Sequence, residues 1–324
     1  TYHPDAGFPR YLPMTLASSP SNGVPRESMA RSATLDYARF LAAVGIIVFH
    51  VGAAGANIGY AALPFFLMLL VFLAFPGAER LDFRTYARSR AARLLQPWVV
   101  WSLIYGSLKL AEVGLTEATI QSEFALWMLF AGPSLHLWFM PFAYAACLAA
   151  WPLAQWSASL SARWQVVCGA LGTGLAVLLV SAGNDSTATQ PVTQWLHALP
   201  AVILGFVFAC LRRRSNPALL VATCAVALAG CLWLADWPKG STQLVIASTA
   251  FALCMAVPLP DRPAARRIAT LSLTLYLAHP MVISVLLRVT SIQDESPEMA
   301  VCAVLGTTLL AILLQRMRRE SSLT

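Results

Sequence analysis

Ten hydrophobic stretches run through most of this chain, and arginine is concentrated in every second connection between them. A segment that crosses a bilayer needs about 20 apolar residues. It must also be helical, because lipid offers its backbone amides no hydrogen-bond partners. The stretches therefore predict an all-α membrane protein with its spanning helices in one bundle. The second predicted span is short enough to be tilted or partly re-entrant. The predicted spans lie near residues 35–54, 61–76, 94–113, 135–155, 165–182, 193–211, 217–235, 241–260, 268–288 and 298–315.

The amino-acid composition supports this fold class. Hydrophobic residues make up 58% of the chain and charged residues 11%, whereas charged residues make up about 25% of a soluble domain. A single transmembrane domain over residues 34–316 leaves no room for a separate soluble enzyme domain. Residues 1–33 are polar, dotted with proline and serine, and lack the apolar core of a cleavable signal peptide. We expect them to form a flexible cytoplasmic tail, and residues 317–324 a short one.

The net charge of +7 is distributed unevenly along the chain. Arginines precede the first predicted span and follow the second, fourth, sixth, eighth and tenth, while the alternate connections are mainly acidic. Because cytoplasmic loops of membrane proteins are enriched in Lys and Arg, both termini are predicted to be cytoplasmic. The positive charge is thus explained by topology, and nothing in the sequence supports a nucleic-acid partner.

The seven cysteines all lie in or beside apolar stretches and form no Cys-x-x-Cys pair. This pattern is typical of small packed side chains rather than of disulfides or a zinc site. A metal site built from His50, His136, His197 and His279 is an alternative, but no HExxH pattern or acidic ligand accompanies these histidines. We therefore expect no metal.

Three ionisable residues, Asp36, Arg39 and His50, share one face of the first predicted span. Arg39 and His50 are eleven residues apart, which places them within about 20° of each other and about 16 Å apart along a helix. Charged groups are costly in hydrocarbon, so this stripe should face a cavity or a protein partner. In the alternative interpretation, Asp36 and Arg39 only anchor the inner end of the helix and His50 lies at the outer interface.

A basic run between residues 84 and 97 leads into the third predicted span and contains Arg88, Arg90 and Arg93. Guanidinium groups recognise phosphate well because their donors match its oxygens. Composition alone favours the alternative, a topological or lipid-headgroup patch.

Prolines 133 and 141 bracket the start of the fourth predicted span and predict a break in regular helix there. His136 and Trp138 lie between them. Such a break is tolerated at membrane depth only where protein or water covers it. The alternative is an outward-facing aromatic belt that contains Trp138.

The ninth predicted span carries Ser272, Tyr276 and His279 on one helical face, followed by Pro280. The proline frees the carbonyl of Tyr276 from its usual helical hydrogen bond. A histidine in the middle of a span beside such a kink is a functional candidate, although it could instead bridge two helices.

In order and spacing, these four segments resemble the acyltransferase-3 family of integral-membrane O-acyltransferases, which act on glycans. The resemblance covers about residues 35–315. The matching positions are Leu35, Asp36, Arg39 and His50, then Arg88, Arg90, Arg93 and Pro97, then His136, Trp138 and Pro141, and finally Ser272, Tyr276, His279 and Pro280. The chain departs from the family in two places: residues 64–68 lack the usual Ser-Gly element, and residues 51–60 contain no acid that could orient His50.

The resemblance implies a function and a set of roles. Acyl-CoA, most often acetyl-CoA, would bind from the cytoplasm through Arg88, Arg90 and Arg93. Arg39 would hold the pantetheine end or the developing oxyanion, and His50 would act as general base or transient acyl carrier. The acceptor would be a surface or lipid-linked carbohydrate, and the membrane a bacterial inner membrane. The residues expected to line or support the acceptor pocket are Asp36, His136, Trp138, Ser272, Tyr276 and His279.

Two other classes of function fit part of the pattern. Broken spans with buried ionisable groups are also typical of proton-coupled secondary transporters, which would need no CoA. A structural or sensory membrane protein would explain the ten spans but not four motifs in family order.

Overall fold

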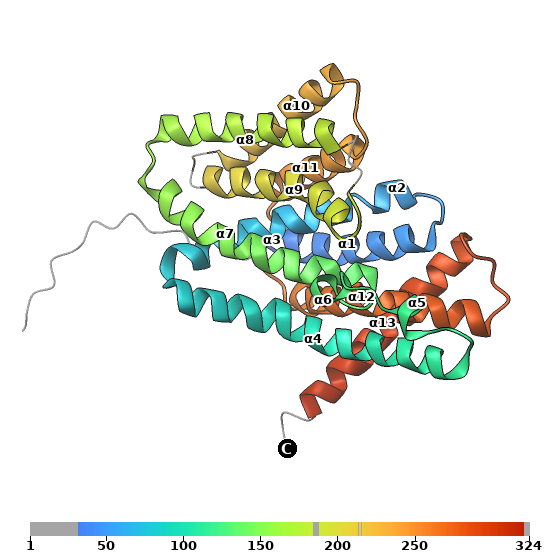
Figure 1. Ribbon diagram of the computed structural model, residues 1–324. Coiled ribbons are helices and arrows are strands. Elements are labelled where there is room, and N and C mark those ends of the chain that lie inside the picture. Colours follow the sequence, from blue (N-terminus) through green and yellow to red (C-terminus); the bar gives the residue numbers. More distant parts are fainter. Residues whose placement is uncertain (1–31, 184–187, 213, 215, 321–324) are drawn as a thin grey trace, which may run out of the picture. The chain divides into compact units, whose positions relative to one another are not determined.

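The structure is a computed structural model that describes residues 32–183, 188–212, 214 and 216–320. Within these ranges every regular element is a helix, as Figure 1 shows. Most of the predicted tail 1–33, and the last four residues of the predicted tail 317–324, lie outside them. The elements are α1 (Ala33–Val51), α2 (Ala56–Gly59), α3 (Ala62–Arg80), α4 (Phe83–Leu115), α5 (Ile120–Glu123), α6 (Met128–Ala131), the 3₁₀ helix η1 (Leu135–Trp138), α7 (Phe139–Ser159), α8 (Ala162–Gly183), α9 (Val192–Leu211), α10 (Pro217–Leu234), α11 (Ser241–Ala256), α12 (Pro263–Val289) and α13 (Pro297–Glu320).

Each predicted span corresponds to one of the longer helices. In the described part of the chain, eight helices are long and apolar enough to cross a membrane, which confirms the predicted fold class. The other two predicted spans are α11, which has 16 residues, and α4, which has 33 and carries the arginine run in its first half. The second predicted span is longer than expected, because α3 continues through Pro76 to Arg80.

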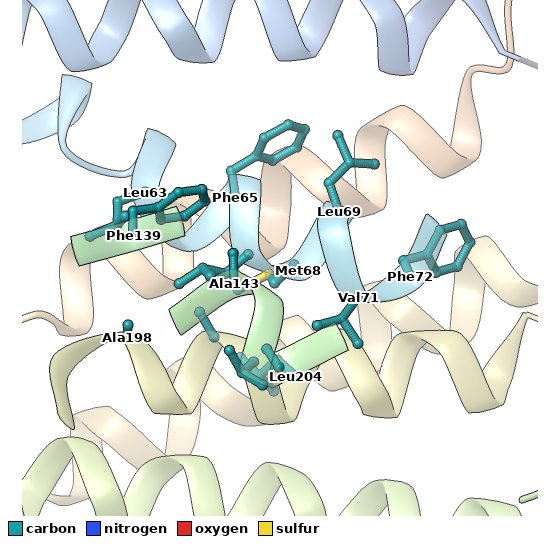
Figure 2. Packing of buried hydrophobic residues seen from close by; sticks show 14 of the residues in the cluster. Leu63, Phe65, Met68, Leu69, Val71, Phe72, Phe139, Ala143, Ala198 and Leu204 are labelled. Atoms are coloured by element: carbon teal, nitrogen blue, oxygen red, sulfur yellow. The ribbon is translucent and has the colours of Figure 1, made fainter. Parts of the chain in front are cut away.

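Helix α3 lies in the middle of the bundle and packs against α7, α9 and α11. Its side chains Leu67, Met68 and Phe72 are almost completely buried. Figure 2 shows Met68 close to Ala143 of α7 and Leu204 of α9. Close packing of these side chains supplies many van der Waals contacts in the centre of the molecule.

The helices α8, α10 and α13 are different, because much of their apolar surface faces outward. Leu171 and Leu178 of α8, Val226 of α10 and Leu305 of α13 are each more than half exposed. Apolar surface of this extent is unfavourable in water. It is suited to contact with lipid, so these helices present the membrane-facing side of the bundle.

Helices α1 and α12 run side by side in the same direction. The N–H of Ala33 donates to the carbonyl of Leu259 near the start of α12, and the two helices share a buried apolar cluster along their length. This pairing brings His50, the last residue of the polar stripe, beside His279 of the ninth predicted span. Next to it, α2 approaches α1 so closely that a Cβ on Gly59 would lie 2.4 Å from the carbonyl oxygen of Gly45.

The connection between α4 and α7 folds back along α4. The ammonium of Lys109 contacts the Glu123 carboxylate at 2.8 Å, and the indole of Trp98 donates to the carbonyl of Ala131 at 3.3 Å. Because Trp98 and Lys109 are eleven residues apart on one helix, the connection returns about 16 Å along α4. The sequence did not predict this re-entrant path. It places η1, with His136, inside the bundle.

Candidate active site

Three histidines from distant parts of the chain meet at one end of the bundle: His50 at the end of α1, His136 in η1 and His279 in α12. The ring centroids of His50 and His279 are 4.6 Å apart, and those of His136 and His279 are 5.5 Å apart. His279 is fully buried and His136 is 6% exposed, whereas His50 is exposed. We call these residues the histidine cluster. The structure thus brings together all three histidines that the motifs singled out.

The main chain orients the ring of His50. Its Nδ1 lies 2.9 Å from the carbonyl oxygen of Ile46, one turn earlier in α1. A carbonyl can only accept, so Nδ1 carries the proton and donates it. In the neutral ring Nε2 then keeps its lone pair, which leaves a basic and nucleophilic nitrogen on the exposed member of the cluster.

His279 is held in a similar way, through the effect of Pro280. The proline lacks an N–H group, so the carbonyl of Tyr276 has no helical donor. The Nδ1 of His279 donates to that carbonyl at 2.8 Å and lies 3.2 Å from the carbonyl of Leu275. Its Nε2 is buried and has no hydrogen-bond partner among the described residues. A second nitrogen lone pair is therefore present in the ring beside His50.

His136 joins η1 to α12. Its Nε2 donates to the carbonyl of Leu277 at 3.3 Å, and the hydroxyl of Ser134 lies 2.9 Å from its Nδ1. The hydroxyl of Tyr276 donates to the carbonyl of His136, and the hydroxyl of Tyr105 donates to that of Leu277 at 2.8 Å. Sequence reasoning missed Tyr105 and Ser134, whose roles depend on the re-entrant connection.

The remaining residues of the α1 stripe lie toward the other end of the helix. Asp36 is 4% exposed, and its carboxylate is 3.8 Å from the guanidinium of Arg39. The eleven-residue spacing keeps Arg39 about 16 Å from His50 along α1. Ser272 of α12 is also buried, with a hydroxyl that has no hydrogen-bond partner in the described chain. It precedes His279 by seven residues, about two helical turns along α12.

Trp138 does not belong to an outward aromatic belt. It is 6% exposed, and its ring packs against Phe139 and Phe142 at centroid distances of 6.1 and 5.7 Å. It supports the start of α7, directly after His136.

The predicted arginines lie on successive turns of α4 but do not point in one direction. Arg88 and Arg93 are exposed. The guanidinium of Arg90 instead packs 5.0 Å from the ring centroid of Tyr86, and a Cβ on Gly77 would lie 2.9 Å from it. At 100° per residue, Arg90 is about 160° away from Arg88 around the helix.

The structure also places an acid near His50, which the local sequence lacks. Glu295, in the connection between α12 and α13, lies over Gly52 at the end of α1. A Cβ on Gly52 would be 3.2 Å from the Cγ of Glu295. No spacing in the sequence relates Glu295 to this end of α1, because it approaches Gly52 only through the packing of α1 with α12 and α13.

The histidine cluster is not arranged as a metal centre. Within the described residues, no group of three His, Cys, Asp or Glu side chains is placed to hold a metal ion. Two of the histidines also use Nδ1 to donate to main-chain carbonyls, as described above. The chemistry that the cluster itself offers is proton transfer or nucleophilic attack by an imidazole nitrogen.

Comparison with known protein families agrees with this chemistry. The sequence model of the acyltransferase-3 family, described as an acyltransferase domain, matches residues 32–316. The match extends from the start of α1 to the last turns of α13 and includes the three histidines and the arginine run. No curated protein and no solved structure matches the chain significantly. The chain therefore belongs to the acyltransferase-3 family and is a membrane acyltransferase.

Proposed function

We propose that this acyltransferase moves an acyl group, most often acetyl, from cytoplasmic acyl-CoA to a hydroxyl of a surface or lipid-linked carbohydrate. In this proposal it acts in a bacterial inner membrane with both termini in the cytoplasm. The observation that carries the proposal is the orientation of His50: its Nδ1 donates to Ile46, which leaves Nε2 available beside His279 at the exposed edge of the histidine cluster.

In the transfer step, Nε2 of His50 removes the proton from the acceptor hydroxyl as its oxygen attacks the thioester carbonyl. The C–S bond then breaks, and the CoA sulfur leaves with the proton that His50 received. Nε2 could instead attack the carbonyl itself and pass the acyl group on. Both routes need the same nitrogen, and in both the unpartnered Nε2 of His279 can accept a hydrogen bond from a reacting group.

In this proposal the donor binds at the opposite end of the bundle from the histidine cluster, near the starts of α1 and α4. Arg88 and Arg93 are exposed there and available to the phosphates of CoA. Arg39 is about 16 Å from His50 along the helix, which favours contact with the pantetheine arm over contact with the oxyanion. Ser272, buried between these levels, offers a hydroxyl to the same arm.

Release of free CoA from acetyl-CoA by the purified full chain tests the proposal. The assay compares wild type with His50→Ala, each with and without membranes that carry crude glycan. We expect acceptor-stimulated release from wild type and its loss in the variant, because His50→Ala removes the reacting nitrogen. The control is Gln121→Ala, which changes an exposed residue of α5.

Equal acceptor-stimulated release by a folded His50→Ala protein would reject the role of His50. No release by folded wild type with any acceptor would reject the acyl-CoA mechanism. Proton- or sodium-driven uptake assays would then test the transporter alternative.

A further inference from the structure

A cavity of about 340 Å³ opens at the same end of the bundle as the histidine cluster. It lies between the start of α3, the end of α8 and the starts of α9 and α11. Tyr60, Gln194, His197 and Gln243 contribute to its lining. Its volume is within the range of small-molecule sites, which is about 300–1,000 Å³.

A series of aromatic rings joins this cavity to His50. The rings of Tyr60 and His197 are stacked 5.3 Å apart and within 8° of parallel. Tyr60 also stacks on Phe49 at 4.2 Å, and the ring of Phe49 meets that of His50 edge-on at 5.1 Å. The rings of Tyr60 and Phe49 therefore connect the cavity wall to His50.

The polar groups of the lining are mainly neutral amides. The Oε1 of Gln194 is buried and has no hydrogen-bond partner among the described residues. The amide nitrogen of Gln243, a partly buried residue, makes a long contact of 3.4 Å with the carbonyl of Asn57. Of the described lining residues, none is Asp or Glu, and the one cation, Lys239, is engaged in an interaction of its own. A buried amide oxygen without a partner, such as that of Gln194, is unfavourable unless a ligand satisfies it.

Gly240 keeps the wall of the cavity in place. Its φ of +89° is favourable for glycine only, and a Cβ there would lie 2.9 Å from the Cε1 of His197. A side chain at this position would therefore be strained and would collide with the His197 ring.

We propose that this cavity is the acceptor subsite and that it binds a neutral polyhydroxylated ring, such as an uncharged pyranose. The inference rests on the proposed function for the identity of the reaction. The apolar face of a sugar ring packs well on aromatic rings, and its hydroxyls both donate and accept hydrogen bonds, as the amides of Gln194 and Gln243 require. In this inference the subsite holds one ring of the glycan, while a hydroxyl on another part of the same glycan reaches His50.

Direct binding tests the subsite without relying on catalysis. The probes are radiolabelled methyl glucoside, methyl galactoside and methyl mannoside, with methyl glucuronide as the charged comparison. The protein is the full chain carrying His50→Ala in lipid nanodiscs. We expect at least one neutral glycoside to bind better than the glucuronide. Adding Gln194→Ala or Gln243→Ala should weaken that binding about tenfold, the effect of roughly one lost hydrogen bond.

The matched control is again Gln121→Ala, which should bind as the parent does. Failure of all three neutral glycosides to bind would overturn the subsite. So would binding by the Gln194→Ala and Gln243→Ala proteins that equals binding by the parent protein. A preference for the glucuronide would overturn its neutral character.

A second measurement separates this inference from the proposed function. In the wild-type background, Gln194→Ala should lose most of the stimulation of CoA release by glycan, whereas the control Gln121→Ala should retain it. Absence of any CoA release from wild type would reject the proposed function. The glycoside-binding measurement alone would then decide whether the cavity is a sugar subsite. Full stimulation in Gln194→Ala would reject the subsite while the acyltransferase mechanism stands.

Discussion

The histidine cluster and the arginine run both carry polar chemistry, but they are built differently. The three histidines come from distant segments, and main-chain carbonyls of Ile46, Tyr276 and Leu277 fix their rings. The arginines come from two turns of one helix, and Arg88 and Arg93 extend from the surface. The contrast indicates that the proposed reacting end is organised before substrate binds, whereas the proposed donor end would gain its geometry from the ligand. Preorganised groups act mainly on kcat, and groups that only hold a substrate act mainly on KM.

The largest effect is expected from His50→Asn. The asparagine amide can still donate to the carbonyl of Ile46, but the variant has no atom in place of Nε2. We expect kcat to fall about 10³-fold, within the range for loss of a general base, with little change in the midpoint of thermal unfolding. Initial rates of CoA release and thermal unfolding in detergent measure the two effects. Near-normal kcat in this variant would show that the orientation of His50 has no catalytic consequence.

His279→Asn should follow, with kcat about 100-fold lower. The amide again keeps the hydrogen bond to the carbonyl that Pro280 leaves without a helical donor, while Nε2 is lost. We expect KM for acyl-CoA to stay constant, because His279 lies at the far end of the bundle from the arginines. His279→Ala provides the comparison: it also removes the donor to Tyr276 and should lower stability as well as rate. Equal rates in both variants and wild type would exclude His279 from the reaction.

Combined replacement of Arg88 and Arg93 by alanine tests the proposed role of the arginine run. We expect KM for acyl-CoA to rise about tenfold, the effect of one or two charge-assisted contacts, with kcat nearly constant. Added salt should raise KM of the wild type more than that of the variant, because it screens exposed charges. Arg163→Ala, an exposed arginine of α8, is the control. A fall in kcat at constant KM would contradict the division of roles between the two regions.

The sequence predicted the parts of this molecule that depend on local pattern. Hydrophobic length located the spanning helices, and the spacing of Arg39 and His50 on α1 placed them on one face. The rule for proline gave the free carbonyl of Tyr276, which the structure shows as the partner of His279. These features follow from helix geometry and backbone chemistry alone.

Other parts depend on contacts between distant segments and could not be read from the sequence. The return of the α4–α7 connection along α4 includes the contact of Lys109 with Glu123, and this path brings Tyr105 close to His136. Glu295 reaches the end of α1 because α12 and α13 pack beside it. No periodicity or motif links such pairs before the helices are assembled.

The smallest effect is expected from Tyr105→Phe, which tests how firmly the histidine cluster is held. The variant removes one hydroxyl that donates to the carbonyl of Leu277, but the Nε2 of His136 still donates to the same oxygen. Because the carbonyl keeps a partner, we expect a loss of about 1 kcal/mol in unfolding free energy and at most about a threefold lower kcat. Titration with SDS measures the first quantity, with Tyr144→Phe on α7 as control. A loss of kcat comparable to that of His279→Asn would mean that a single hydrogen bond from α4 sets the position of His136. The geometry of the histidine cluster would then depend on the re-entrant connection. The cluster and the arginine run would still differ, but in the contacts that organise each of them.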